Sequence, residues 1–140
     1  MKVKILVEAQ ICPTEAPEKV KEAVRNIYSG PLNEEPTADG VRGVLRGASE
    51  DIDDLKGLKE SLRSDRIRAA AQAAMTSGLS ENRFTVYLNK QVAYAKHVSF
   101  CTTLNESPLG PITLIVEADA PLTAIEWLTS KTDWTKPQPS

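Results

Sequence analysis

The first eleven residues alternate between apolar and polar side chains, which is the pattern of a strand with one face on a core. The apolar side of this predicted strand is formed by Val3, Ile5, Val7, Ala9 and Ile11. The pattern then becomes helical, because Val20, Val24 and Ile27 recur at the spacing of one helix face. Pro17 suits the first turn of this helix, and Gly30-Pro31 ends it.

The middle of the chain predicts a weak strand followed by two helices. The stretch 41–49 contains glycines that suggest a bulge or an edge strand. Ser49 is a good N-cap for the first helix, and the acidic residues at 50–54 favour its positive end. The buried stripe of that helix is Ile52, Leu55, Leu58 and Leu62. Ser64-Asp65 offers a new cap, so a second helix, or a bent continuation, is expected from about 66 to 76.

The last third of the chain predicts three strands and a helix. The strand sequences are RFTVYLNK, VAYAKHVSFC and PITLIVEA. The third is expected at the centre of the sheet, because Ile115 points away from Ile112 and Leu114 and makes both faces apolar. The final helix begins near Pro121, and its inward residues are expected to be Leu122, Ile125 and Leu128.

The order of these elements predicts a single α+β domain over residues 1–130. Strands come in groups with helices between them, which favours two layers: a largely antiparallel sheet with helices packed on one face. The stretch 131–140 has no periodicity and is expected to be a frayed tail.

Three polar residues, Asn89-Lys90-Gln91, interrupt two of the predicted strands. A three-residue hairpin loop there pairs Leu88 with Val92 on one apolar face, so the register favours an exposed hairpin tip. His97 then falls on the opposite face and is expected to be an exposed or edge histidine rather than a ligand or a base. Lys96 falls on the apolar side, where a bulge or a snorkelling side chain is expected.

Composition narrows the possible functions. The chain has 140 residues, of which 41% are hydrophobic and 26% charged, and no apolar run is long enough to span a membrane. The N-terminus does not resemble a signal peptide, and Cys12 and Cys101 are expected to be reduced packing residues, so a cytoplasmic location is expected.

Motifs for chemistry are missing from the sequence. A single histidine and two distant cysteines favour no metal site, and neither a phosphate-binding loop nor a serine elbow is present. We therefore predict no cofactor, no small-molecule ligand and no catalytic residues. An enzyme whose site assembles from distant positions stays open.

Positive charge gathers in the middle of the chain although the net charge is −2. Residues 56–96 hold eight basic and three acidic side chains, a balance of +5. Lys59, Arg63 and Arg66 would form one ridge if their helix is continuous, and such a ridge can meet phosphates. The alternatives are an ordinary solvated face, or pairing of Arg66 and Arg68 with the acidic residues at 50–54. The predicted RNA contacts are Arg63, Arg66, Arg68, Arg83, Lys90 and Lys96, with Asn89 and Gln91 as polar contacts, and an RNA surface requires that they share a face.

Four stretches of the chain resemble a known family. CPTEAPEKV, DRIRAAA, VYLNKQVAYAKHVSF and ESPLGPITLIVEADAP together resemble uncharacterised protein family 0201, a set of small archaeal proteins. The resemblance implies a fold like that of the large-subunit ribosomal protein that binds 5S RNA. It also implies RNA binding, without an established activity or catalytic residues. His97 stands where the family often has a small or basic residue, and ESPLG fits a type I turn before the central strand.

These observations favour RNA binding through the basic segment 56–96. The alternative is a non-enzymatic interaction module that forms a homodimer through an exposed sheet edge or face. An enzyme with an unrecognised site is the third possibility.

Overall fold

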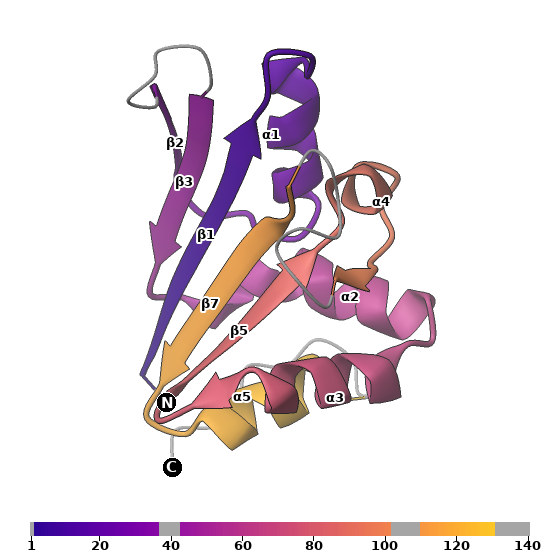
Figure 1. The fold of residues 1–140 in the computed structure, drawn as a ribbon. Coiled ribbons are helices and arrows are strands. Elements are labelled where there is room, and N and C mark those ends of the chain that lie inside the picture. Colours follow the sequence, from indigo (N-terminus) through magenta and orange to yellow (C-terminus); the bar gives the residue numbers. More distant parts are fainter. Residues whose placement is uncertain (1, 37–42, 102–109, 131–140) are drawn as a thin grey trace.

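The computed structural model describes residues 2–36, 43–101 and 110–130 as a curved sheet covered by helices (Figure 1). The strands are β1 (Val3–Ile11), β2 (Leu32–Pro36), β3 (Gly43–Ser49), β4 (Leu79–Ser80), β5 (Arg83–Leu88), β6 (Phe100–Cys101) and β7 (Ile112–Ala118). The helices are α1 (Pro17–Arg25), the 3₁₀ turn η1 (Ile52–Leu55), α2 (Lys56–Ser64), α3 (Arg68–Ser77), α4 (Lys90–Tyr94) and α5 (Pro121–Leu128).

All strand pairs of the sheet are antiparallel, in the order β2-β3-β1-β7-β5-β4, and β6 pairs with β5. β7 lies between β1 and β5, so its predicted central position is confirmed. The register aligns the buried parity of neighbouring strands, since Val7 lies opposite Leu114 and Val86 lies opposite the same residue on the other side. Apolar side chains therefore form continuous rows across one face of the sheet.

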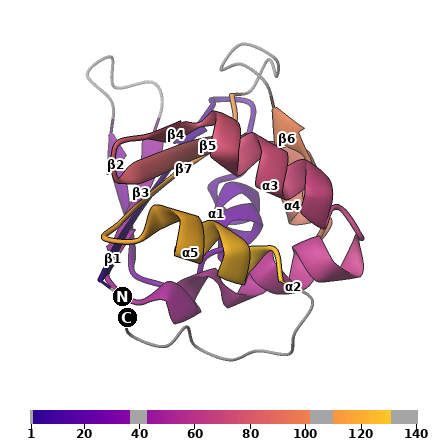
Figure 2. The ribbon, with the colours of Figure 1, turned by 90° about the horizontal axis from the view of Figure 1, so that it is seen from below.

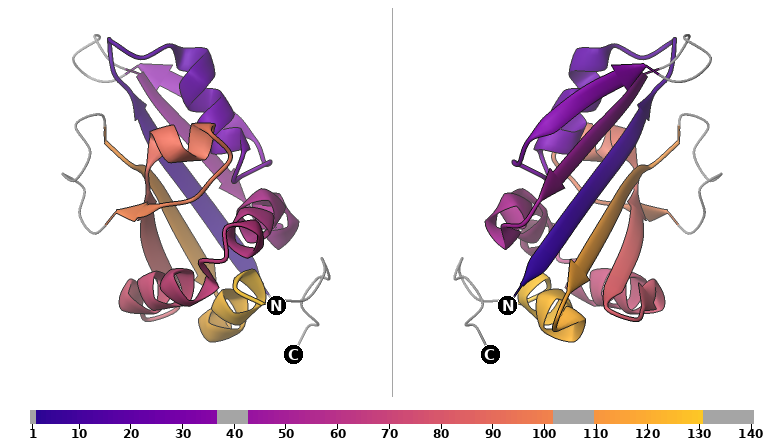
Figure 3. Two further views of the ribbon diagram at one scale, coloured as in Figure 1. Left: turned by 90° about the vertical axis from the view of Figure 1, so that its right-hand side faces the viewer. Right: turned by 90° about the vertical axis from the view of Figure 1, so that its left-hand side faces the viewer.

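The helices cover that apolar face and leave the other face open. Seen from below, the strands lie along the left and top of the molecule and the helices fill the space beside them (Figure 2). Two further views show the same two layers (Figure 3). The predicted α+β class is therefore confirmed, while the likeness to the ribosomal protein stays a prediction. Among the described helices, none is long and apolar enough to cross a membrane.

The segment after β5 corrects the sequence prediction. Residues 90–94 form the short helix α4, and the strand predicted over 92–101 is reduced to β6. The Asn89 side chain accepts a hydrogen bond from the Val92 amide at 3.0 Å, which is the geometry of a helix N-cap. The predicted hairpin with Leu88 opposite Val92 is therefore wrong. The Asn89 side chain caps the first turn of a helix here instead of forming part of a hairpin loop.

The predicted helices of the middle segment are confirmed with different ends. Ile52, Leu55, Leu58 and Leu62 are buried as predicted. The capping residue, however, is Asp51, whose carboxylate accepts from the Asp53 amide, while Ser49 ends β3. Helix α2 ends at Ser64 and α3 begins as a separate helix at Arg68, because Arg66 between them has a positive φ of 57°.

The last helix has a different inward face from the predicted one. Ile125 and Leu128 are buried as expected, but Leu122 is 62% exposed. Ala124 and Trp127 are buried instead, so the inward face of α5 is formed by Ala124, Ile125, Trp127 and Leu128. Cys12 and Cys101 are both half-buried. The predicted features at Val41, Ser107–Leu109 and 131–140 lie outside the described residues.

A glycine sets how closely α2 approaches the end of α1. A Cβ atom on Gly57 would lie 2.4 Å from the main-chain oxygen of Asn26, which is far inside van der Waals contact. Because that oxygen belongs to the backbone, it cannot swing away as a side chain would. Gly57 therefore permits the close packing that places α2 beside α1.

We predict that Gly57→Ala lowers the free energy of unfolding by about 1–3 kcal/mol through overpacking. The loss is expected even though alanine is the better helix former by about 1 kcal/mol. Gly43→Ala is the matched control, since its Cβ would meet Ile11 at an ordinary 3.5 Å. Urea denaturation of both variants measures the difference, and equal stability would contradict this packing argument.

Candidate nucleic-acid interface

The eight predicted RNA contacts do not share one surface. Arg63 and Lys96 line a common groove, and Arg66 is exposed just beyond α2. Arg83 lies on the open face of the sheet, opposite Glu117 of β7. The remaining four are Arg68, which is half-buried at the start of α3, Asn89, which caps α4, Lys90, which is buried, and Gln91, which lines a separate pocket.

Lys90 corrects the prediction most sharply, because its side chain is only 4% exposed instead of standing at a hairpin tip. Its ammonium donates to the main-chain oxygen of Gln10 at 2.7 Å and to Glu15 Oε1 at 2.8 Å. A buried ammonium group needs such partners, since burial without them costs several kcal/mol. Lys90 therefore joins α4 to the end of β1 and to the turn before α1, and its ammonium is not available to a phosphate.

The partner at Gln10 follows from the register of the sheet. The pairing of β1 with β7 ends at Ala9 opposite Ile112, and the residue before Ile112 is Pro111. Proline has no amide hydrogen to donate, so it cannot extend the ladder to the next carbonyl. The Lys90 ammonium takes the hydrogen-bonding place that a strand amide would otherwise fill.

Glu15 is held in its charged form by these contacts. Burial is the strongest influence and by itself would raise the pKa of the carboxyl group. The hydrogen bonds and charge of Lys90, together with the Cys12 amide, outweigh burial and lower the pKa of Glu15 below its usual 4.5. The pair is therefore an ionised, hydrogen-bonded link inside the helix layer.

Lys59 is a second buried lysine, so the ridge predicted for Lys59, Arg63 and Arg66 is wrong. The Lys59 side chain donates to the Trp127 main-chain oxygen and to Ser130 Oγ, both at 2.7 Å. Its ammonium also lies 5.1 Å from the centre of the Trp127 ring. Burial, followed by the charges of Arg63 and Arg68, lowers the pKa of Lys59. Lys59 thus binds the C-terminal end of α5 to α2.

A groove of about 520 Å³ brings together two exposed cations, Arg63 and Lys96. Arg63 comes from the last turn of α2, and Lys96 follows α4 with a positive φ of 67°. The rest of the lining is small and mostly polar: Asn26, Gly57, Glu60, Ser61 and Ser64. Two cations beside hydroxyl and amide groups can receive the phosphates of a nucleic acid backbone, although Glu60 adds one negative charge to the rim.

Asp65 fixes the two walls of this groove relative to each other. Its carboxylate lies 2.9 Å from His97 Nδ1 and accepts from the Val98 amide at 3.1 Å. The hydrogen bond with His97 is the main reason that the pKa of Asp65 is lowered. The end of α2 is thereby connected to the segment after α4. His97 is exposed as predicted, with 63% of its side chain accessible.

A deep pocket that gathered His97, Asn89 and a carboxylate would favour the third possibility, an enzyme. The two residues serve separate contacts instead, since Asn89 caps α4 and His97 pairs with Asp65.

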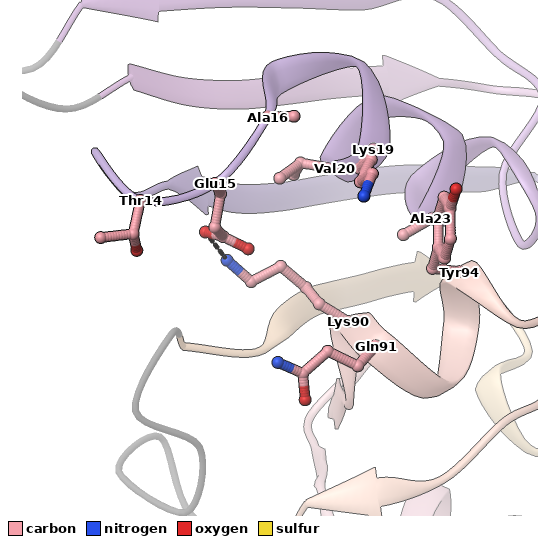
Figure 4. Close-up of a pocket in the computed structure, with 9 residues that line it drawn as sticks. All are labelled: Thr14, Glu15, Ala16, Lys19, Val20, Ala23, Lys90, Gln91 and Tyr94. Atoms are coloured by element: carbon pink, nitrogen blue, oxygen red, sulfur yellow. Dashed lines mark hydrogen bonds and ion pairs between the residues drawn. The ribbon is translucent and has the colours of Figure 1, made fainter.

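A pocket of about 430 Å³ between α1 and α4 was not predicted from the sequence (Figure 4). Its lining includes the Glu15–Lys90 pair, Gln91, Lys19 and Tyr94. Tyr94 is 41% exposed, so one of the large hydrophobic side chains of the described residues faces this pocket. The signal that could have located it is the N-cap at Asn89, because a helix from residue 90 places Gln91 and Tyr94 three positions apart on one side.

We predict that Lys90→Met destabilises the fold by about 2–4 kcal/mol, because it leaves the Glu15 carboxylate buried without its cation. The double variant with Glu15→Leu should recover part of this loss in urea denaturation.

The pH dependence supplies a second readout of this pair. Because the folded pKa of Glu15 lies below 4.5, the pair stabilises the protein above that pH and loses this contribution as pH falls through the folded pKa. Lys90→Met should make the fall in stability below pH 4.5 shallower. An unchanged slope would show that the ion pair does not stabilise the native state.

Known proteins with this sequence pattern and fold identify the family. A family model described as RNA binding matches residues 4–118. A UPF0201 protein of Sulfurisphaera tokodaii is 37% identical over 143 residues, which cover 98% of this chain and 97% of the relative. A UPF0201 protein of Aeropyrum pernix is 38% identical over 132 residues, covering 94% and 87% of the two chains.

A solved structure agrees with this assignment. The crystal structure of a UPF0201 protein from Methanococcus jannaschii matches with a TM-score of 0.80 and 30% identity, over 91% of this chain and 99% of that chain. The chain therefore belongs to uncharacterised protein family 0201, as its four characteristic stretches predicted.

Proposed function

We propose that this protein binds RNA through the groove that contains Arg63 and Lys96. The observation that supports it best is the convergence of two exposed cations from segments 33 positions apart, beside hydroxyl and amide side chains. The match of residues 4–118 to a family model described as RNA binding supports the same class of partner.

The groove suits backbone contacts rather than sequence reading. Arginine and lysine position phosphates, and serine hydroxyls add hydrogen bonds to the same groups. Because the whole chain carries a net charge of −2, attraction to RNA has to be local instead of global. Arg66, exposed next to the groove in sequence, is the third contact we propose. Lys59 and Lys90 are not among them, since their ammonium groups bind main-chain oxygens.

The binding surface is tested with two variants of equal charge. Arg63→Gln/Lys96→Gln removes two positive charges from the groove, and Lys4→Gln/Arg83→Gln removes two from the open face of the sheet. A fluorescently labelled structured RNA should bind the groove variant at least about tenfold more weakly at 50 mM salt. The slope of log affinity against log salt should also become shallower by about 1.5, since two phosphate contacts are lost.

The sheet-face variant should bind as the wild type does. Equal weakening in both variants would refute the proposed surface. If the wild type binds no RNA at 50 mM salt, the RNA function itself is refuted.

A homodimer through the open sheet face is the second candidate, and one exposed leucine favours it. Leu6 is 39% exposed at the centre of that face, between Ala48 and Ile115 in the strand register. Arg46 binds Glu8 at 3.2 Å and Glu35 at 2.9 Å beside this apolar centre. An apolar centre with a charged rim is the usual layout of an interface. The β2 edge is less suited, because it carries acidic residues and Pro36.

For this candidate we predict a dimer of the wild-type chain in sedimentation velocity and a monomer of Leu6→Arg. Leu122→Arg is the control, because Leu122 is equally large and more exposed but lies on α5. A wild-type monomer at every concentration tested would rule the dimer out.

A further inference from the structure

We propose that the pocket between α1 and α4 receives an unpaired nucleobase of the bound RNA, stacked on Tyr94. This inference rests on the proposed function and names the part of the RNA that the second hollow takes. Glu15 and Tyr94 line opposite ends of the pocket, and Lys19 lies between them on the α1 side (Figure 4).

Tyr94 supplies the stacking surface. Its exposed ring lies beside the buried, apolar side chains of Val20 and Ala23, which give the pocket a dry wall. The Lys19 ammonium lies 6.0 Å from the centre of the ring. A base that enters the pocket can take the place of this ammonium over the ring, and Lys19 is then within reach of the flanking phosphate. Aromatic rings beside cations are the usual platform for single-stranded nucleic acid.

Polar groups at the other end suit the edge of a base. Glu15 Oε1 accepts hydrogen bonds from Lys90 and from the Cys12 amide, and the Cys12 side chain adds a further hydrogen bond to the carboxyl group, which is held ionised. An ionised carboxylate has about four acceptor sites, so one more site is left for the edge of a base. Among the described residues, the Gln91 amide has no hydrogen-bond partner and can both donate and accept. A carboxylate acceptor favours bases with an amino group, which uracil lacks.

The pocket adjoins the groove proposed for the phosphates. Asn26 lines the groove, and its side-chain amide donates to the main-chain oxygens of Ala93 at 2.8 Å and Tyr94 at 3.4 Å. The stacking residue and the groove thus lie on either side of one seam between α1 and α4. One RNA strand can place phosphates against Arg63 and Lys96 and turn the neighbouring base into the pocket.

The test compares Tyr94→Ala, Tyr94→Phe and Gln91→Ala in binding a labelled twelve-nucleotide single-stranded adenine RNA and a double-stranded RNA of equal length. Tyr94→Ala should weaken single-strand binding about tenfold, while Tyr94→Phe keeps it and double-strand binding is unchanged. Gln91→Ala should lower the preference for adenine over uracil oligonucleotides. Thermal unfolding checks that the half-exposed position tolerates alanine.

The outcomes separate the two proposals. If single-strand binding is lost in the Arg63/Lys96 variant but unchanged in Tyr94→Ala, the base pocket is wrong and the RNA groove stands. If the wild type binds no RNA, the proposed function fails, and the pocket is tested alone by adding adenosine and uridine monophosphates. Absence of any shift of the Tyr94 ring signals in NMR spectra would then overturn the pocket as well.

Discussion

The sheet can bury only one of its faces, because alternate residues of its central strands are apolar on one side and largely polar on the other. Ile5, Leu114 and Val86 belong to the buried parity, while Lys4 and Glu117 belong to the other. Every described helix therefore packs on the same side, and the helices must also hold one another in place (Figure 2). The groove with Arg63 and Lys96 and the pocket with Tyr94 both lie where segments of this helix layer meet. The open face of the sheet holds the surface around Leu6 that is proposed for dimerisation.

Two buried lysines stabilise this layer, and both bind main-chain oxygens where a helix or a strand pairing ends. Lys59 binds the Trp127 oxygen at the end of α5, and Lys90 binds the Gln10 oxygen where β1 runs past its partner strand. A long flexible ammonium suits this role, since it carries three donors and reaches over several ångströms. The positive charge of residues 56–96 is thus partly structural, and the surface is less basic than the sequence suggests.

Hydrophobic periodicity predicted the sheet and most helices. A strand or helix that buries one face needs apolar residues at alternate positions or at helical spacing, and this pattern is visible in the sequence. It failed at residues 89–99, where three apolar residues fit a strand, but the Asn89 cap and the partners of Lys90 select a helix. Those partners, Gln10 and Glu15, are about 80 positions away, so no local pattern contains them. The same limit applies to the candidate site: Arg63 and Lys96 were named as RNA contacts from local charge and both are exposed, but Lys19 and Tyr94 meet only in three dimensions.

The contacts of Lys90 connect three of the sequence stretches by which this chain resembles its family. Glu15 lies in CPTEAPEKV, Lys90 in VYLNKQVAYAKHVSF and Pro111 in ESPLGPITLIVEADAP, and all three belong to one joint between β1, α4 and β7. The three residues depend on one another, because each fits only while the other two are present. A lineage that replaced the lysine would be left with a proline that cannot donate and a carboxylate without a cation. Changes at these positions are therefore expected to occur together across the family.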